Sequence, residues 1–239
     1  MVLMACSGCF RFDVGMKQTL LFITGTDTGV GKTVLTALLT RFLREQGINA
    51  AALKPVCSGS RSDARALHAA MDGELTLDEI NPWHFRAPVA PLLAARREKT
   101  RVRLPAVLTH ARAIQKRFDV VLVEGAGGLF SPLGEGFHSG DLIASLRATP
   151  VIVGSNRLGV VNQLRLTLHA LPPPARAAAR IVLMSPATPD AATRSNALLL
   201  AEFCRQTSVF TLPWLGKDFA GDKVLKKTRV QRVLSALFS

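Results

Sequence analysis

The chain has 239 residues, of which 48% are hydrophobic and 20% charged, and its formal net charge at pH 7 is +13. This length suits one α/β domain with a sizeable core, and the composition is that of an ordinary globular protein. No apolar run approaches the roughly 20 residues that cross a bilayer, so we expect neither a membrane segment nor a membrane partner.

Residues 1–17 show neither helical nor strand periodicity, and they lack the charged, apolar and small-residue order of a secretory signal. Cys6 and Cys9 form a CxxC pattern, for which a redox or metal site is the alternative interpretation, but the sequence offers no second pair nearby. We expect an unstructured extension or a start placed too early, with Met16 as the true start, followed by one domain over residues 18–239. Cysteines without disulfide-like spacing indicate a reducing cytoplasm.

Short apolar runs alternate with amphipathic stretches along the rest of the chain. The apolar runs predict strands at Thr19–Thr24, Ala50–Lys54, Val120–Glu124, Val151–Ser155, Ile181–Ser185 and Val209–Leu212. The amphipathic stretches predict helices at Lys32–Gln46, Ser62–Met71, Leu104–Arg117, Gly140–Arg147, Val161–Leu171, Asp190–Gln206 and Lys223–Phe238. Pro172, Pro173 and Pro174 predict a stiff turn. This alternation indicates βαβ units and a mostly parallel sheet with helices on both faces, and ligands bind such a sheet at the carboxyl ends of its strands.

A phosphate-binding loop follows the first predicted strand. It reads GTDTGVGKT from Gly25 to Thr33 and leads directly into a predicted helix. Glycines let backbone N–H groups converge on phosphate oxygens, and the N-terminus of the helix adds its unpaired N–H groups. The sequence therefore predicts a single-domain P-loop NTPase-type fold, with Lys32 at the β- and γ-phosphates and the Thr33 hydroxyl on Mg²⁺. The residues expected to bind the nucleotide here are Gly29, Val30, Gly31, Lys32, Thr33 and Val34.

Several blocks in fixed order, over residues 19 to about 216, resemble those of the dethiobiotin synthetases. They are GTDTGVGKT, KPVCSGS from Lys54, NPWHF from Asn81, VEGAGG from Val123, Ser131-Pro132-Leu133, Leu158-Gly159 with Asn162, and Leu212-Pro213-Trp214. The resemblance implies an ATP-dependent carbon–nitrogen ligase of biotin biosynthesis. In that reaction CO₂ adds to one amine of 7,8-diaminononanoate, ATP phosphorylates the carbamate, and the second amine closes the cyclic urea. The resemblance also implies a homodimer with the diamine near the subunit interface.

Candidate catalytic and metal-binding residues follow from the residues and from this resemblance together. Lys54 ends a strand beside that of the phosphate loop, so its ammonium can face the same crevice; a solvated strand-end lysine is the alternative. We expect Lys32 and Lys54 to be catalytic cations near the γ-phosphate, and Lys54 to hold the carbamate and the transferring phosphoryl group. Mg²⁺ prefers oxygen ligands, for which Thr33, Asp63 and Glu124 are the candidates, although Asp63 could instead cap a helix.

Hydroxyls and glycines complete the expected substrate site. Thr28 and Ser58 are candidate contacts to substrate or phosphate, with plain turn residues as the alternative, and Gly127 and Gly128 permit close approach of substrate to the backbone. The resemblance implies that Leu158 and Asn162, at a helix start, receive the substrate carboxylate from the partner subunit; an ordinary capped helix is the alternative. Trp83 and His84 are expected to pack.

The expected base-binding site departs from the family. Ser185, Pro213 and Leu215 are expected beside the adenine, but Ser185 stands where the family usually has an asparagine that reads the base. A tyrosine often found near the substrate carboxylate has no counterpart, because the chain contains no tyrosine.

Two other functions compete with the ligase. The net charge of +13 favours a partition-type ATPase that binds DNA, but such proteins often carry a second lysine early in the loop, where this chain has Thr26 and Asp27. Another P-loop synthetase of the same group would usually carry a glutamine-hydrolysing domain, for which this chain is too short. We therefore expect small-molecule substrates and no nucleic acid.

Overall fold

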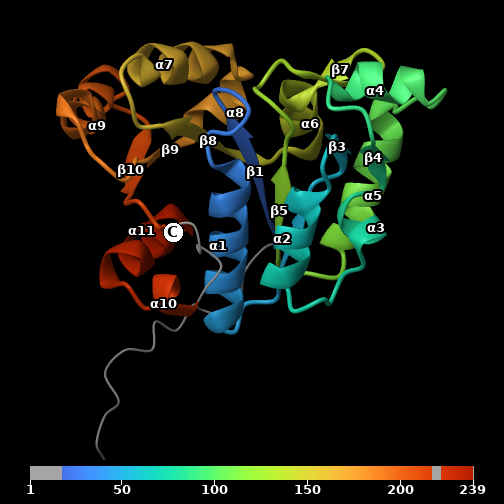
Figure 1. Cartoon of the computed structure of the whole chain (residues 1–239), viewed down its shortest axis with the longest axis horizontal. Helices are drawn as coiled ribbons and strands as arrows, with labels where there is room; N and C mark the ends of the chain where they lie inside the picture. The colour runs from blue at the N-terminus through green and yellow to red at the C-terminus, as the bar shows by residue number, and fades with distance from the viewer. Residues whose placement is uncertain (1–17, 217–221, 239) are drawn as a thin grey trace, which may run out of the picture.

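A six-stranded parallel sheet forms the centre of the molecule (Figure 1). The computed structural model describes residues 18–216 and 222–238, and in it the strand order is β10-β9-β8-β1-β5-β2. All neighbouring strands of this sheet run parallel. The strands are β1 (Thr19–Gly25), β2 (Ala50–Leu53), β5 (Val120–Glu124), β8 (Thr149–Ser155), β9 (Arg180–Met184) and β10 (Ser208–Leu212). The predicted fold class is therefore confirmed, with strand ends that differ by one or two residues.

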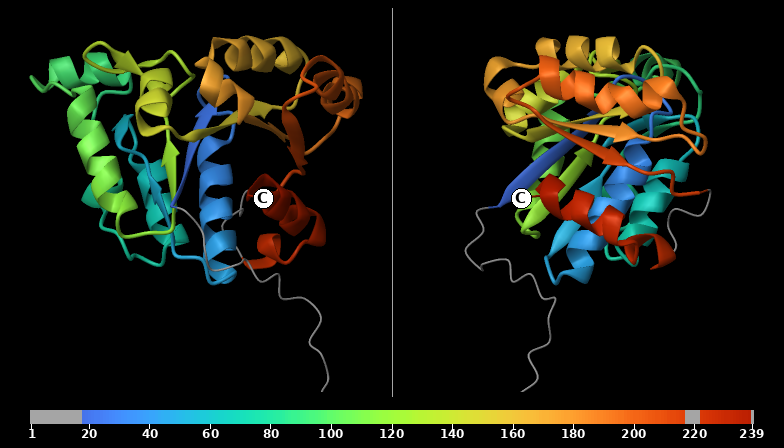
Figure 2. Two further views of the ribbon diagram at one scale, coloured as in Figure 1. Left: turned by 180° about the vertical axis from the view of Figure 1, so that it is seen from behind. Right: turned by 90° about the vertical axis from the view of Figure 1, so that its left-hand side faces the viewer.

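Helices on both faces bury this sheet, which is why its strands are apolar runs rather than alternating ones. The longer helices are α1 (Lys32–Glu45), α2 (Ser62–Ala70), α5 (Leu104–Gln115), α6 (Ser139–Leu146), α7 (Val160–Ala170), α9 (Ala191–Phe203) and α11 (Thr228–Phe238). Helix α1 packs on β1 and β5 and contacts α2 and α11 (Figures 1 and 2). Helices α5 and α6 contact each other, and they pack on β5 and β1, respectively.

Short strands and helices lie outside the central sheet, and among them only α10 overlaps a helix predicted from the sequence. The short strands are β3 (Val56–Ser58), β4 (Trp83–Phe85), β6 (Pro132–Gly134) and β7 (Phe137–His138). The short helices are α3 (Leu77–Ile80), α4 (Pro91–Arg97), α8 (Pro173–Ala177) and α10 (Asp222–Leu225). Strands β3 and β4 pair in parallel, while β6 and β7 form an antiparallel hairpin.

Two predictions about helices are wrong. The helix predicted over Lys223–Phe238 is two helices, α10 and α11, because the chain turns at Lys226 and Lys227 between them. The stiff turn predicted at Pro172–Pro174 instead begins the short helix α8, where a proline fits the first helical turn because its missing N–H would have no partner there. No helix in the part of the chain that the structure describes is long and apolar enough to cross a membrane.

The topology brings three strand ends together. Strand β5 lies between β1 and β2, so the prediction that the strand of Lys54 lies beside that of the phosphate loop is wrong. The strands are parallel, however, so the phosphate loop after β1, Glu124 at the end of β5 and Lys54 just after β2 still share one edge. Such an edge is where open parallel sheets bind ligands.

Candidate active site

The phosphate loop has a backbone that side chains would distort. Gly29 and Gly31 have φ values of +73° and +101°, which L-residues with a side chain rarely adopt, and Gly31 is the N-cap residue immediately before α1. A Cβ on Gly25 would lie 2.7 Å from Cγ2 of Val30. These constraints keep the backbone N–H groups of the loop directed inward, as a phosphate requires.

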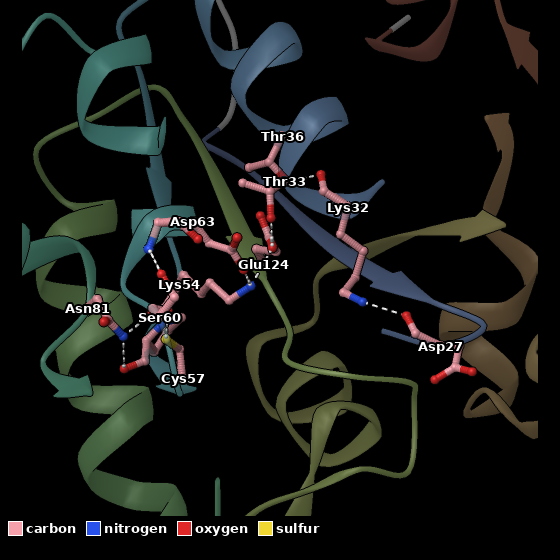
Figure 3. Close-up of polar contacts among 12 residues, drawn as sticks. Asp27, Lys32, Thr33, Thr36, Lys54, Cys57, Ser60, Asp63, Asn81 and Glu124 are labelled. Carbon is pink, nitrogen blue, oxygen red and sulfur yellow. Dashed lines mark hydrogen bonds and ion pairs between the residues drawn. The ribbon is translucent and has the colours of Figure 1, made fainter. Parts of the chain in front are cut away.

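Lys32 lies beneath this loop and is 5% exposed. Its Nζ donates a hydrogen bond of 2.7 Å to the carbonyl oxygen of Asp27, so the lysine spans the loop from α1 to its far side (Figure 3). Burial, together with the nearby charge of Lys54, lowers the pKa of Lys32 to about 8. An ammonium that lacks a carboxylate partner in direct contact is poised for an anionic ligand.

A second cluster lies beside the loop, where Lys54 meets two carboxylates (Figure 3). Its Nζ bonds to Asp63 and, at 2.7 Å, to Oε1 of Glu124, and the same Oε1 accepts a 2.7 Å hydrogen bond from the Thr33 hydroxyl. Burial lowers the pKa of Lys54, but Glu124 and Asp63 outweigh burial and the pKa is raised above its ordinary value. Lys54 is therefore a permanent cation at neutral pH.

Glu124 retains an unused ligand atom. The residue is 1% exposed, and its Oε2 is buried without a hydrogen-bond partner among the described residues. A buried carboxylate oxygen without a partner is costly, and a cation would satisfy it. Thr33 and Asp63 supply further oxygens next to Glu124, so the three residues fit Mg²⁺, which completes its shell with water. Over residues 18–216 and 222–238, no group of three His, Cys, Asp or Glu side chains is placed so that it could hold a metal ion.

The structure also decides between the two interpretations of Asp63. The residue that caps α2 is Arg61, and Asp63 lies in the first helical turn with its carboxylate on Lys54. The interpretation of Asp63 as a helix cap is therefore wrong. The alternative of a solvated strand-end lysine is wrong as well, because Lys54 is buried.

Both clusters line one cleft of about 740 Å³. Its walls also contain Thr28, Gly29, Gly31, Val34, Cys57, Ser58, Ala126, Gly127 and Ser131. The Ser58 hydroxyl donates to the carbonyl oxygen of Val89 at 2.5 Å, and Gly127 has a φ of +67°. The expected catalytic residues, most of the phosphate loop and the expected metal ligands therefore lie together.

Several predicted residues lie away from this cleft. Leu158 is 83% exposed just before α7, and Asn162 lines a separate groove between α7 and α9. Ser185 follows β9, and its N–H donates to the carbonyl oxygen of Leu212, which places it next to Pro213 at the adjoining strand end. Met184 packs against Gly31, so Ser185 borders the phosphate loop on the side opposite Lys54.

Two residues have contacts that sequence reasoning missed. The Ser131 hydroxyl accepts a 2.9 Å hydrogen bond from the N–H of Gly128, which orders the turn after β5. His84, expected only to pack, lies 2.8 Å through Nε2 from the carbonyl oxygen of Gly59 and so holds the loop after β3. Both residues belong to sequence blocks that resemble the dethiobiotin synthetases, and this membership is the one feature of the sequence that could have indicated their roles. Cys57 and Cys204 are buried free thiols, and the CxxC of Cys6 and Cys9 lies outside the described residues.

Comparison with known proteins agrees with this geometry. Residues 19–218 match a family model described as an AAA domain. The chain is 44% identical over 149 residues to the ATP-dependent dethiobiotin synthetase BioD of Akkermansia muciniphila, covering 62% of this chain and 70% of that protein. It is 41% identical over 199 residues to the enzyme of the same name from Anaeromyxobacter dehalogenans strain 2CP-1, covering 81% and 89%.

Solved structures show the same fold. The MinC:MinD cell division protein complex of Aquifex aeolicus aligns with a TM-score of 0.59 at 16% identity, over 92% of this chain and 96% of that chain. MinD of the same organism aligns with a TM-score of 0.54 at 15% identity, over 90% and 93%. At such identity the likeness concerns the architecture alone.

Proposed function

The chain belongs to the ATP-dependent dethiobiotin synthetase family, and from this membership we propose how its cleft performs the reaction. It is an ATP-dependent ligase that forms dethiobiotin in biotin biosynthesis. One observation carries the proposed residue roles: Lys54 and Glu124, from two neighbouring strand ends, meet in a cleft that also contains the phosphate loop.

The nucleotide binds along the phosphate loop, with its triphosphate on the N–H groups of residues 29–34. The ammonium group of Lys32 exchanges its hydrogen bond to the carbonyl oxygen of Asp27 for contacts with the β- and γ-phosphates. The negative charge of the phosphates favours the protonated form of Lys32, which burial disfavours. The base lies on the far side of the loop, near Ser185, Pro213 and Leu215.

Thr33, Asp63 and Glu124 would hold Mg²⁺ beside the γ-phosphate. A bound Mg²⁺ neutralises phosphate charge and orients the oxygens of the triphosphate. The unpartnered Oε2 of Glu124 supports this assignment.

The reaction requires a fixed positive charge more than it requires a base. CO₂ forms a bond to one amine of the diaminononanoate, which loses a proton and becomes a carbamate. A carbamate oxygen attacks the γ-phosphorus as the bond to ADP breaks, and the second amine then attacks the carbonyl carbon, loses a proton and expels phosphate. Lys54, whose pKa is raised, stays charged and stabilises the carbamate and the transferring phosphoryl group. Thr28, Ser58 and Gly127 line the cleft that the substrate would occupy, and Gly128 lies next to it in the turn after β5.

The tail carboxylate of the substrate is bound by a second subunit. Leu158 and Asn162 do not line the cleft of their own chain, yet they begin a helix whose N-terminus suits an anion. Leu158, just before this helix, and Leu166, in its second half, are 83% and 63% exposed, as expected for residues that a partner covers. We therefore propose a homodimer, and from the reaction of the family we propose a cytoplasmic enzyme that acts on small molecules rather than on nucleic acid.

An ADP-release assay tests the proposal. The complete mixture contains ATP, Mg²⁺, diaminononanoate and bicarbonate, and each is omitted in turn while dethiobiotin is followed by mass spectrometry. ADP release should require both the diamine and bicarbonate. Release independent of both, together with salt-sensitive and ATP-dependent DNA binding, would instead favour the switch protein.

A further inference from the structure

We infer that Asn81 and Arg61, which do not line the cleft, position Lys54 and Asp63 for catalysis. The inference rests on the function proposed for Lys54 and extends it to residues behind the active site. Its basis is a continuous set of hydrogen bonds that begins at the backbone of Lys54 and ends at the start of α2.

The backbone of Lys54 and Pro55 is held by the segment between α3 and β4 (Figure 3). Strand β2 lies at the edge of the sheet, so the chain beyond it needs partners other than a neighbouring strand of that sheet. The N–H of Lys54 donates to Ile80 at 3.0 Å, and the N–H of Trp83 donates to Pro55 at 3.1 Å. Between them, Nδ2 of Asn81 donates to the carbonyl oxygens of Lys54 at 2.7 Å and Pro55 at 3.4 Å.

Asn81 is itself held by one guanidinium group. Arg61 donates from Nη2 to the carbonyl oxygen of Asn81 at 2.9 Å and from Nε to its Oδ1 at 3.3 Å. The contact of Oδ1 with Nε assigns the amide orientation, since the other amide atom must then donate to Lys54. Asn81 is 0% exposed, so water cannot replace these bonds.

Arg61 couples this arrangement to the acidic side of the cluster. It immediately precedes α2, two residues before Asp63, and it also donates to the carbonyl oxygen of Leu77 at 2.8 Å. One arginine thus fixes both the start of the helix that carries Asp63 and the asparagine that holds Lys54. The two charged groups that meet in the cleft are therefore placed by a shared support on the side away from the substrate.

A displaced ammonium should affect the chemical step rather than nucleotide binding. Transfer of the phosphoryl group depends on the position of the Lys54 charge to within a fraction of an ångström, and a 1 Å misplacement costs about a hundredfold in rate. The phosphate loop lies between β1 and α1 and makes none of these contacts. Loss of the Asn81 amide should therefore lower kcat by about 10- to 100-fold while the KM for ATP changes less than about threefold.

The experiment is a double-mutant cycle on dethiobiotin formation. Asn81→Asp keeps the shape of the side chain and the acceptor for Arg61 but removes the N–H donor to the carbonyl oxygen of Lys54. Arg61→Lys, a second variant, keeps the positive charge but removes the guanidinium group that donates to Asn81 from two nitrogen atoms. Asp78→Ala is the matched control, because Asp78 touches the same guanidinium group at 2.6 Å but its side chain is 87% exposed. Melting temperature and ATP affinity are measured for every variant.

A role of Asn81 through Lys54 and a merely structural role differ in whether the losses of kcat in the single variants add up in the double variant. If Asn81 acts through Lys54, Asn81→Asp should lower kcat in the wild type but cause no further loss in Lys54→Met, and Asp78→Ala should behave as wild type. Equal losses in both backgrounds, or a fall in ATP affinity that matches the fall in kcat, would overturn the positioning role. A wild type that forms no dethiobiotin, or a fully active Lys54→Met, would refute the proposed function and this inference together. An inactive Lys54→Met beside a fully active Asn81→Asp and Arg61→Lys would refute the inference alone.

Discussion

The pKa values of two buried lysines at the active site shift in opposite directions because the surroundings of the two side chains differ. Lys32 contacts a backbone carbonyl oxygen and lies near the positive charge of Lys54, so burial is not offset and its pKa falls to about 8. Lys54 contacts two carboxylates, whose attraction exceeds the cost of burial. Lys54 can therefore serve as a constant charge, whereas the charge of Lys32 depends on what occupies the loop.

The low pKa of Lys32 predicts that ATP binding takes up a proton above pH 8. In the free protein Lys32 is half neutral near pH 8, and bound phosphates favour its charged form, so ATP affinity should fall as the pH rises through about 8. Below about pH 7 the lysine is already protonated and contributes no dependence. Calorimetry at pH 8.5 in two buffers of different ionisation enthalpy measures the uptake. Lys32→Arg should abolish it, and equal heats for the wild type in both buffers would contradict the prediction.

Lys32→Ala and Lys54→Met should fail in different ways. Lys32→Ala removes the cation at the phosphates and should abolish detectable turnover in a folded protein. Lys54→Met should retain ATP affinity but lose the chemical step by about 10²–10³-fold, the usual effect of removing one group that stabilises the transition state. Calorimetry and single-turnover product formation separate the two. A Lys54→Met protein whose only defect is weaker ATP binding would exclude the assigned role.

Ser185 should relax the choice of nucleotide. A buried amide pairs with the adenine edge as both donor and acceptor, whereas a hydroxyl is shorter and offers one donor. Losing such a pairing weakens discrimination by about 1–3 kcal/mol, or roughly one to two orders of magnitude. CTP, GTP and UTP should therefore support measurable turnover at equal concentration, and Ser185→Asn should sharpen the preference for ATP. If ATP outperforms the others by about a thousandfold or more in the wild type, the prediction fails.

At the scale of elements, the sequence predicts what local pattern and parallel topology determine. Lys54 and Glu124 follow apolar runs, and neighbouring parallel strands must end at one edge, so their meeting could be predicted. Strands β3 and β4 have three residues each, too few for a periodic signal, and they exist because each pairs with the other. The role of Asn81 depends on side chain-to-backbone bonds across 27 residues of sequence, which no local pattern encodes.

The turn after β5 should tolerate no side chain at Gly127. This glycine has a φ of +67°, and a Cβ there would lie 2.3 Å from the Ser131 hydroxyl that binds Gly128. Gly136 is a matched control, with a φ of +70° and open space around it. Gly136→Ala should lower the free energy of unfolding by about 1 kcal/mol, through backbone strain alone. Gly127→Ala should lower the free energy of unfolding by more than this and should also lower kcat. Denaturant unfolding and steady-state rates of the two variants test this, and equal effects would show that the clash is relieved without consequence.

At the scale of the whole molecule, the proposed function requires a second subunit to complete the site. The cleft contains the phosphate loop, Lys54 and Glu124, but Leu158 and Asn162 lie elsewhere on the same chain. Phe130 and Leu166 line one further groove and are 60% and 63% exposed, which extends the apolar surface near α7. A second copy of the chain would cover this surface and complete the site, so we expect light scattering to show a dimer.

Mixing two defective variants tests whether the site is shared between subunits. Asn162→Asp places a carboxylate where the substrate carboxylate should bind, and such like-charge contacts cost several kcal/mol, so this variant should lose activity at low diamine concentration. Lys54→Met is defective for a different reason, because it loses the chemical step by about 10²–10³-fold. In a homodimer with shared sites, a mixed dimer has one site with both defects and one intact site. Because random exchange makes half of the dimers mixed, an equal mixture should regain about a quarter of wild-type activity. The separate variants, and the mixture before subunit exchange, serve as controls. No regain after exchange that light scattering or mass spectrometry confirms would show that each chain binds the carboxylate with its own residues.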